Sequence, residues 1–314
     1  MPENFTTPIL FLIYNRPETA QRTFSRIQEI RPRYLYLAAD GPRDKVLGDD
    51  KLCAQTRRLI LAAIDWECEV KTLFRETNLG VGRAVSGALD WFFQNVDQGI
   101  IIEDDCLATN SFFYFCQELL IRYKDQENIF LISGNKNVAA SQRAASDYFF
   151  SQLPSAWGWA TWRRVWQKYD FNLTGLPEFL EQKTIAKIFS KKEQQEYWLD
   201  LFLEMKNQKR NNWDYQLAFL CFQQGGLSII PGINLVINIG WSYEPKNVTL
   251  IDQPGPLNLN HPTRIETNPE YDAQAAASLI TGRYRLKKFL KKIKLFNAAK
   301  GLYKKLYADR PLHQ

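Results

Sequence analysis

The segment Gly99–Cys106 reads GIIIEDDC, and it decides the fold because a short apolar run ends abruptly in three carboxylates. An isoleucine run of this length is typical of a strand buried on both faces of a parallel sheet. In an open α/β sheet, ligands bind at the carboxyl ends of the strands. The sequence therefore predicts that Glu103, Asp104 and Asp105 lie at a ligand-binding edge. A solvated acidic turn is the alternative.

Three adjacent carboxylates repel one another unless a proton or a cation neutralises them. Alternation along an extended strand places Glu103 and Asp105 on one side and Asp104 on the other. A hard divalent ion takes a few carboxylate oxygens and fills its other positions with phosphate and water oxygens. We therefore expect Mn²⁺ or Mg²⁺ at this edge, held mainly by Asp105, with Glu103 and Asp104 beside the diphosphate of a ligand.

Outward from this segment, short β-rich runs alternate with amphipathic helices through the first half of the chain. Such alternation is typical of an α/β fold with a Rossmann-like, mostly parallel sheet flanked by helices. The strands expected here are 9–14, 34–39, 69–74, 99–102 and 129–133. The expected helices are 17–30, about 50–65, about 82–95 and one that begins near 111.

The second half is rich in tryptophan and predicts longer helices near 158–168, 191–208 and 213–223, then strands within 227–238. The segment Asn238–Pro262 is polar and rich in proline, which predicts a long loop. Loops of this length are usually functional lids or disordered segments. We expect this one to close over a bound ligand and exclude water.

The chain has 314 residues, of which 45% are hydrophobic, so it can bury a large core. Its five scattered cysteines favour a reducing compartment over a disulfide framework. The N-terminus carries no basic cluster, and no apolar run reaches the length of a spanning helix. We therefore expect a cytoplasmic protein, or one that touches the inner face of a membrane peripherally.

The net charge of +6 is unevenly distributed. Residues 283–314 hold eleven Lys or Arg and one acid, a net of +10, whereas residues 1–282 hold 29 bases and 33 acids, a net of −4. An acidic body with a basic tail argues against a nucleic acid as partner. Residues 283–307 predict a basic amphipathic helix. It either lies on an anionic membrane surface or packs its apolar stripe on the body, leaving its lysines in solvent.

A small apolar strand that ends in Glu-Asp-Asp resembles the DxD motif of the GT-A glycosyltransferases, in particular the Golgi N-acetylglucosaminyltransferases with Glu-Asp-Asp and related bacterial glycosyltransferases. Four further segments match that family in its order, over roughly residues 8–275. They are Ile9–Arg16 and Leu35–Asp40 for its first two strands, Ser155–Trp159 for its acceptor-side turn and Asn212–Tyr215 for its Trp-Asp-Asp-Trp segment.

The resemblance implies a GT-A catalytic domain over 1–282, with a nucleotide-sugar half to about 135, an acceptor half over 136–282, and a basic tail over 283–314. It also implies a metal-dependent transfer, inverting at the sugar, from a nucleoside-diphosphate sugar to a hydroxyl of a glycan or lipid-linked acceptor. A UDP-sugar is the favoured donor.

The donor residues implied by the resemblance follow the first two strands and the start of a glycine-rich helix. Asn15 and Arg16 would bind the donor, Arg16 through a phosphate, and Asp40 would accept a hydrogen bond from the uracil imide. Asp40-Gly41-Pro42 is also a good turn in any protein. The segment Asn78–Arg83 can hold phosphate on backbone amides, with Arg83 beside it, although an ordinary helix start explains it equally well.

The resemblance assigns Asp214 as the catalytic base that deprotonates the acceptor hydroxyl. The alternative is an acid at the N-cap or in the first turn of a helix, where Asp is common. Trp157 and Trp159 are expected to stack on the acceptor sugar. We expect Trp162 and Trp166, one helical turn apart, to be core residues, and we expect His261 to be structural.

Three positions depart from the family pattern. Cys106 replaces an aliphatic residue, Tyr215 stands where the family has its second Asp, and Ala84 stands where it has a histidine. Two other functions compete with glycosyl transfer. A sugar nucleotidyltransferase would need a glycine-rich basic loop after the first strand, where this chain has Asn15-Arg16-Pro17. A non-catalytic adaptor for sugars or a membrane surface would use the tail.

Overall fold

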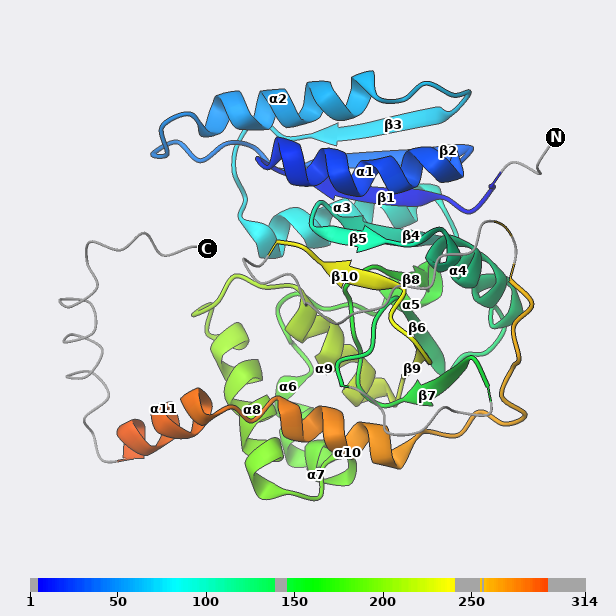
Figure 1. Ribbon diagram of the computed structural model, residues 1–314. Helices are drawn as coiled ribbons and strands as arrows, with labels where there is room; N and C mark the ends of the chain where they lie inside the picture. The colour runs from blue at the N-terminus through cyan, green and yellow to red at the C-terminus, as the bar shows by residue number, and fades with distance from the viewer. Residues whose placement is uncertain (1–4, 139–145, 241–254, 256, 293–314) are drawn as a thin grey trace.

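A computed structural model describes residues 5–138, 146–240, 255 and 257–292. Its centre is a sheet of eight strands in the order β3-β2-β1-β4-β8-β6-β9-β7 (Figure 1). The first four strands of the chain pair in parallel. They are β1 (Ile9–Ile13), β2 (Tyr34–Ala39), β3 (Glu69–Phe74) and β4 (Gln98–Glu103). Strands β1 and β2 are apolar and almost wholly buried, as strands between two helical layers require, whereas the edge strand β3 is half polar and partly exposed.

The other half of the sheet is mixed. Strand β8 (Trp159–Trp162) runs antiparallel between β4 and β6 (Ile129–Ser133), so β4 and β6 point the same way. Strand β9 (Leu227–Pro231) is parallel to β6, and β7 (Tyr148–Ser151) is an antiparallel edge strand. Strands β5 (Cys106–Ala108) and β10 (Val236–Asn238) form a separate antiparallel pair. The expected α/β class with a mostly parallel sheet is confirmed.

Helices cover both faces of this sheet. Helices α1 (Pro17–Ile30) and α2 (Asp49–Ala62) lie together on one face of β1–β3, and α3 (Val81–Asn95) lies on the other (Figure 1). Pro17 occupies the first turn of α1, where its missing N–H costs nothing. Thr109 is the N-cap of helix α4 (Asn110–Arg122), and its side chain accepts a hydrogen bond from the backbone N–H of Phe112.

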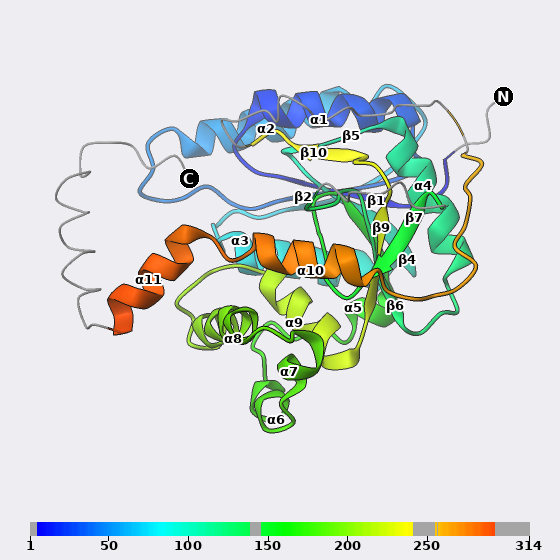
Figure 2. The ribbon, with the colours of Figure 1, turned by 60° about the horizontal axis from the view of Figure 1, so that its bottom comes forward.

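The remaining helices gather below the sheet (Figure 2). Their contacts are largely aromatic: Trp198 lies against Phe202 and Phe222, with ring centroids 5.7 and 4.9 Å apart. Such pairs add to the free energy gained from burial alone. The helices are α5 (Arg163–Trp166), α6 (Leu176–Glu181), α7 (Thr184–Ile188), α8 (Lys192–Lys206), α9 (Asp214–Gln224), α10 (Pro269–Ser278) and α11 (Gly282–Lys292).

The helix expected over 158–168 is wrong in its first half, because Trp159–Trp162 is strand β8 and only Arg163–Trp166 is helical. Pairing with β4 on one side and β6 on the other outweighs the helical spacing of the tryptophans. Trp162 and Trp166 are both buried, as expected, although they belong to different elements. His261 contacts Tyr148 and Glu118, remote in sequence from the carboxylates, which agrees with a structural role.

The tail begins as α11, which contacts the body through polar side chains and through the ring of Tyr284 on Tyr197, and which leaves Leu286 and Phe289 exposed. Whether the whole apolar stripe packs on the body or lies on a membrane stays a prediction. The rest of the helix predicted to residue 307 lies outside the described residues, and so does most of the loop expected to close over a ligand. No helix in the described part of the chain is long and apolar enough to span a bilayer.

Candidate active site

A cavity of about 460 Å³ opens at the carboxyl edge of the sheet, between the ends of β1, β2 and β4 and the first turns of α3. The strand order reverses at β1: β2 and β3 lie on one side of it, and β4 lies on the other side. This is the topological switch point at which open α/β sheets bind ligands. Its lining includes an apolar wall of Leu12, Ile13, Ala38, Ala39, Val81, Ala84, Val85 and Ala88.

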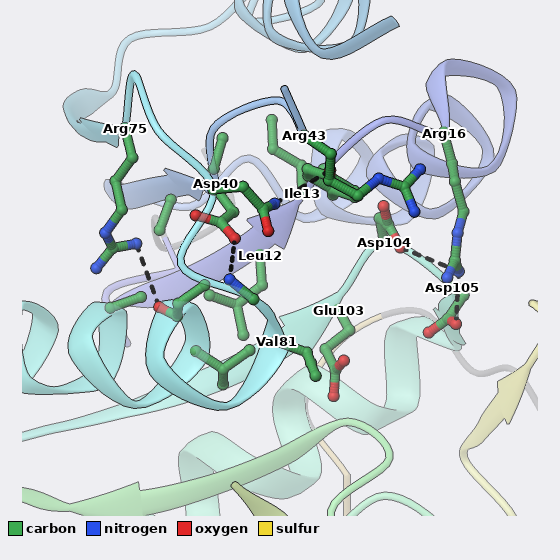
Figure 3. A pocket seen from close by; sticks show the side chains of 18 residues that line it. Leu12, Ile13, Arg16, Asp40, Arg43, Arg75, Val81, Glu103, Asp104 and Asp105 are labelled. Atoms are coloured by element: carbon green, nitrogen blue, oxygen red, sulfur yellow. Dashed lines mark hydrogen bonds and ion pairs between the residues drawn. The ribbon is translucent and has the colours of Figure 1, made fainter. Parts of the chain in front are cut away.

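The carboxylates lie at one end of this cavity, but not as expected along the strand. Strand β4 ends at Glu103, and Asp104 and Asp105 form a turn before β5, so the alternation of an extended strand no longer applies. Arg16 Nη1 lies 3.6 Å from Asp104 Oδ1 and 2.9 Å from Asp105 Oδ2, whereas Glu103 points away from it (Figure 3). Both aspartates therefore face Arg16, which contradicts the predicted arrangement.

Burial and mutual repulsion act against the charged forms of the carboxylates at this end of the cavity. Burial, together with the charges of Asp105, Asp104 and Asp214, raises the pKa of Glu103 to about 8. Burial also raises the pKa of Asp104 to about 7, opposed by the nearby Arg16 guanidinium. Desolvation and like charges both favour neutralisation of these groups.

The residues present fit a divalent cation. Asp104 Oδ2 is buried, and no donor in the described part of the chain reaches it. Within the described residues, no three His, Cys, Asp or Glu side chains are arranged to hold a metal by themselves. An ion here would therefore take one or two carboxylates and complete its shell with phosphate and water, as Mg²⁺ commonly does. Arg16 supplies positive charge at this place in the structure.

The end of β10 closes against the same turn. Ile239 N donates to Asp105 O at 2.8 Å, and a Cβ at Gly240 would lie 2.3 Å from Asp105 Oδ2. A side chain at position 240 would therefore displace the Asp105 carboxylate. Glycine is required there so that the backbone can approach the carboxylate.

A second polar group stands beside the cavity, centred on the buried Asp49 at the start of α2. Its carboxylate accepts from Tyr14 Oη and Asn15 Nδ2, each at 2.6 Å, and from the backbone and guanidinium of Arg43. These hydrogen bonds hold the pKa of Asp49 well below its usual range. Asn15, expected at the donor, instead orients Asp49, while Tyr14 and Arg43 line the cavity.

At the other end of the cavity, Asp40 fixes the surrounding loops (Figure 3). Its carboxylate accepts from the backbone N–H groups of Gly41, Leu79 and Gly80, all at 3.0–3.1 Å. Both oxygens are thus engaged with the protein in this conformation. Asp40 lines the cavity as expected, and a contact with a nucleobase stays a prediction.

The two arginines near α3 differ in position. Arg75 lines the cavity and donates to Ala84 O at 3.2 Å. Arg83, the residue expected beside phosphate, is not part of the lining; its guanidinium lies over the ring of Phe171, 4.8 Å from the centroid. The backbone of Gly80 lines the cavity, but the first turn of α3 directs Arg83 away from it.

Two stacked tryptophans connect the segment that carries Asp214 to strand β4, which ends in the carboxylates. Trp159 on β8 pairs with Ile101 of β4 and stacks on Trp213, with ring centroids 5.6 Å apart. Asp214 follows Trp213 directly and is the first residue of α9, so its charge lies close enough to raise the pKa of Glu103. Burial raises the pKa of Asp214 itself. Asp214 is a first-turn acid, and this position is compatible with a role as base.

The two tryptophans expected at the acceptor differ in exposure. Trp157 is 45% exposed, whereas Trp159 is 1% exposed and one of its faces is covered by Trp213. Stacking on a sugar ring requires an accessible face, so Trp159 does not provide one here. The turn that carries Trp157 is held at the end of β6, where Ser133 Oγ donates to Ser155 O at 2.6 Å.

Four residues around the cavity were not assigned from the sequence, Tyr14, Arg43, Asp49 and Arg75, and Asn78 was named only as the first residue of the segment Asn78–Arg83. Tyr14 and Arg75 each follow the last residue of a strand, β1 and β3, and this position was a usable signal. Nothing in the sequence singled out Asp49, because an acid at the start of a helix is common.

The fold and the cavity together define an α/β protein with a cavity at the switch point of its sheet. No family model and no curated protein matches the chain. Among solved structures, it is similar to the mannosyltransferase PcManGT from Pyrobaculum calidifontis in complex with GDP-Man and Mn²⁺, with 12% identity and a TM-score of 0.36. The match covers 54% of this chain and 48% of the mannosyltransferase, so it spans about half the length of each.

The chain is also similar to HddC from Yersinia pseudotuberculosis, both alone and complexed with GMP-PN. The identity is 12% in each case, with TM-scores of 0.34 and 0.35. Each match covers 55% of this chain and 87% of HddC. These similarities concern the arrangement of strands and helices over about half the chain, and the function has to be argued from the site.

Proposed function

We propose that the chain is a metal-dependent glycosyltransferase that uses a nucleoside-diphosphate sugar, with a UDP-sugar favoured. The observation that carries this proposal is the contact of Arg16 with the Asp104 and Asp105 carboxylates at one end of the cavity, where the charge of Asp214 also raises the pKa of Glu103. A cavity with an apolar wall and a charged end suits a ligand that has a flat base and a diphosphate.

The donor would lie along the cavity, with its base against the apolar wall and its diphosphate toward Arg16 and Arg43. A guanidinium forms paired hydrogen bonds with phosphate oxygens, so both arginines suit this task. A Mn²⁺ or Mg²⁺ ion, held mainly by Asp105, would neutralise the charge of the leaving diphosphate. Asp104 is the second carboxylate available to it.

Asp214 is proposed as the base. The acceptor oxygen forms a bond to the anomeric carbon as the bond from that carbon to the diphosphate breaks, and the hydroxyl proton passes to the Asp214 carboxylate. A single displacement of this kind inverts the anomeric centre. Burial favours Asp214 as base because a carboxylate with a raised pKa is a better proton acceptor. Trp157, exposed on the turn before β8, is the residue offered to the acceptor sugar.

The test is release of nucleoside diphosphate from a panel of UDP- and GDP-sugars by the full chain, with Mn²⁺, with Mg²⁺ and with a chelator. We expect slow hydrolysis that requires metal, and faster release when a glycan or lipid-linked acceptor is added. Formation of pyrophosphate from a nucleoside triphosphate and a sugar phosphate would show a nucleotidyltransferase instead. Binding of sugar without any turnover would support the adaptor function.

A further inference from the structure

Helix α11 contacts the body through its polar side. Arg285 donates to both carboxylate oxygens of Glu193, at 2.7 and 3.0 Å, and Lys288 pairs with Glu196. Tyr284 Oη donates to Asp200 at 3.2 Å. The three acids lie on one side of α8, at steps of three and four residues, so they form a row that matches the side chains of α11.

The opposite side of α11 is apolar. The spacing of 3.6 residues a turn places Leu286 opposite the face that residues 284, 285 and 288 share, and Phe289 at the border of that face, one turn after Arg285. The structure agrees, since these side chains are 57% and 58% exposed. An amphipathic helix on a globular body normally turns its apolar face inward. Helix α11 is reversed, and its apolar face is free within the described part of the chain.

The charge around this face indicates the partner. Residues 283–292 contain six Lys or Arg and no acid, and residues 283–314 have a net charge of +10 against −4 for the rest of the chain. Arg285 and Lys288 are paired with α8. A helix with Leu and Phe on one face and Lys and Arg around them has the composition of helices that lie in the interface of anionic bilayers.

We propose that the outer face of α11 docks on an anionic lipid bilayer. Leu286 and Phe289 enter the boundary between headgroups and acyl chains, and basic residues of the segment face the lipid phosphates. The ion pairs with α8 hold the helix to the body so that its apolar face stays outward. Both views place α11 at the left of the molecule, away from the sheet (Figures 1 and 2). This proposal does not depend on the catalytic activity.

The experiment is flotation of the full chain with vesicles of phosphatidylcholine alone and of phosphatidylcholine mixed with phosphatidylglycerol. The variants are Leu286→Ser with Phe289→Ser, which keeps every charge, and Ile121→Ser as the matched control, since Ile121 is another exposed apolar residue, at 60%. We expect the wild type and Ile121→Ser to bind the anionic vesicles only, less as salt rises. The double variant should bind the anionic vesicles at least about tenfold more weakly than the wild type.

Three outcomes would overturn the proposal. One is a wild-type chain that ignores anionic vesicles at low salt, and another is a double variant that binds as the wild type does. The third is a double variant that melts well below the wild type or changes the oligomeric state in sedimentation. That result would show that the folded chain or a second copy covers the apolar face. An unchanged melting temperature together with lost flotation supports lipid docking.

Discussion

The Oδ1 of Asn211 accepts a hydrogen bond of 3.0 Å from the backbone N–H of Gly82. This contact joins the loop before α9 to the first turn of α3. The first turn of α3 lines the cavity, and the loop leads directly to Asp214. A Cβ at Gly82 would lie 2.4 Å from Asn211 Oδ1 and 2.8 Å from the Asn212 carbonyl oxygen, so the two segments meet without room for a side chain.

The first prediction follows from this contact. Gly82→Ala should force Asn211 and Asn212 away from α3 and displace Asp214 from its position near Glu103. Small misplacements of catalytic groups are costly, and we expect turnover to fall by about tenfold to a hundredfold. Donor affinity should stay within about twofold, since the cavity lining is unchanged. Steady-state kinetics and donor titration measure the two effects. Asn207→Ala, in the same loop, is the control, and equal turnover of both variants would refute the coupling.

The second prediction concerns the metal. Asp105→Ala should abolish metal-dependent binding of UDP while the melting temperature stays near that of the wild type. The physical reason is that the ion needs this carboxylate to hold it beside the diphosphate. Calorimetric titration of UDP with Mn²⁺ is the measurement. Asp44→Ala removes an exposed acid from the loop after β2 and should bind UDP normally. Binding by Asp105→Ala that still responds to Mn²⁺ would show that the site is elsewhere.

The third prediction concerns Arg16, which occupies the place of a cation beside Asp104 and Asp105. Arg16→Gln should raise the affinity for Mn²⁺ alone, because the competing charge is gone, and lower the affinity for UDP, because a phosphate partner is lost. We expect each change to be about fivefold to thirtyfold, the effect of about one charge-assisted hydrogen bond. Titration of Mn²⁺ and of UDP separately distinguishes this from general damage, which would weaken both.

The fourth prediction tests Asp214 as base. Asp214→Asn keeps the shape of the side chain and removes its basicity, so turnover should fall by about 10²–10⁴-fold at nearly constant donor affinity. Glu178→Gln removes another acid from the first turn of a helix, α6, and should leave turnover unchanged. A turnover of Asp214→Asn within a few-fold of the wild type would assign Asp214 to helix stabilisation alone.

The fifth prediction is a dependence of stability on pH. Asp49 is 1% exposed and its pKa is lowered in the folded state, chiefly by Arg43, Tyr14 and Asn15, with Cys53 also nearby. A depressed pKa stabilises the fold fully above the unfolded value of about 3.9, and this contribution shrinks below that pH and is lost only as pH falls through the much lower folded-state value. Asp49→Asn should therefore cost about 2 kcal/mol at neutral pH, and progressively less as pH falls from about 4 toward about 2. Denaturant unfolding at neutral pH and across this acidic range measures the difference. A constant difference would mean that packing, not charge, dominates.

The sequence predicted the parallel half of the sheet closely, because its strands are short β-rich runs between turn residues. Strands β2 and β3 have the expected bounds, and so does β6 in the mixed half. The antiparallel strands were harder to predict from the sequence. Strand β8 holds two tryptophans whose spacing to Trp166 suggested a helix, and only the neighbouring strands β4 and β6 make it a strand. Pairing of this kind depends on residues distant in the sequence, so local periodicity does not show it.

The candidate site, like the fold, was predictable from the sequence only in part. The edge that holds Arg16, Asp40 and the carboxylates was predictable, because the carboxyl ends of parallel strands meet at one edge. The hydrogen-bond partners of these side chains were not. Asn15 turns to Asp49, and Arg83 turns to Phe171, because helix and loop geometry beyond the strand ends sets their direction. The proximity of Asp214 to Glu103 depends on the stacked pair Trp159 and Trp213, which no local pattern indicates.

Strand β8 lies between β4 and β6, so one hydrogen-bonded sheet runs through both the cavity half and the tryptophan-rich half. The two halves therefore share a single cooperative unit, and heat or denaturant should melt them in one transition. A fragment that ends near residue 135 would leave the backbone of β4 and β6 without β8. Exposed strand edges of this kind recruit other chains, so such a fragment should self-associate instead of folding as an independent nucleotide-binding module.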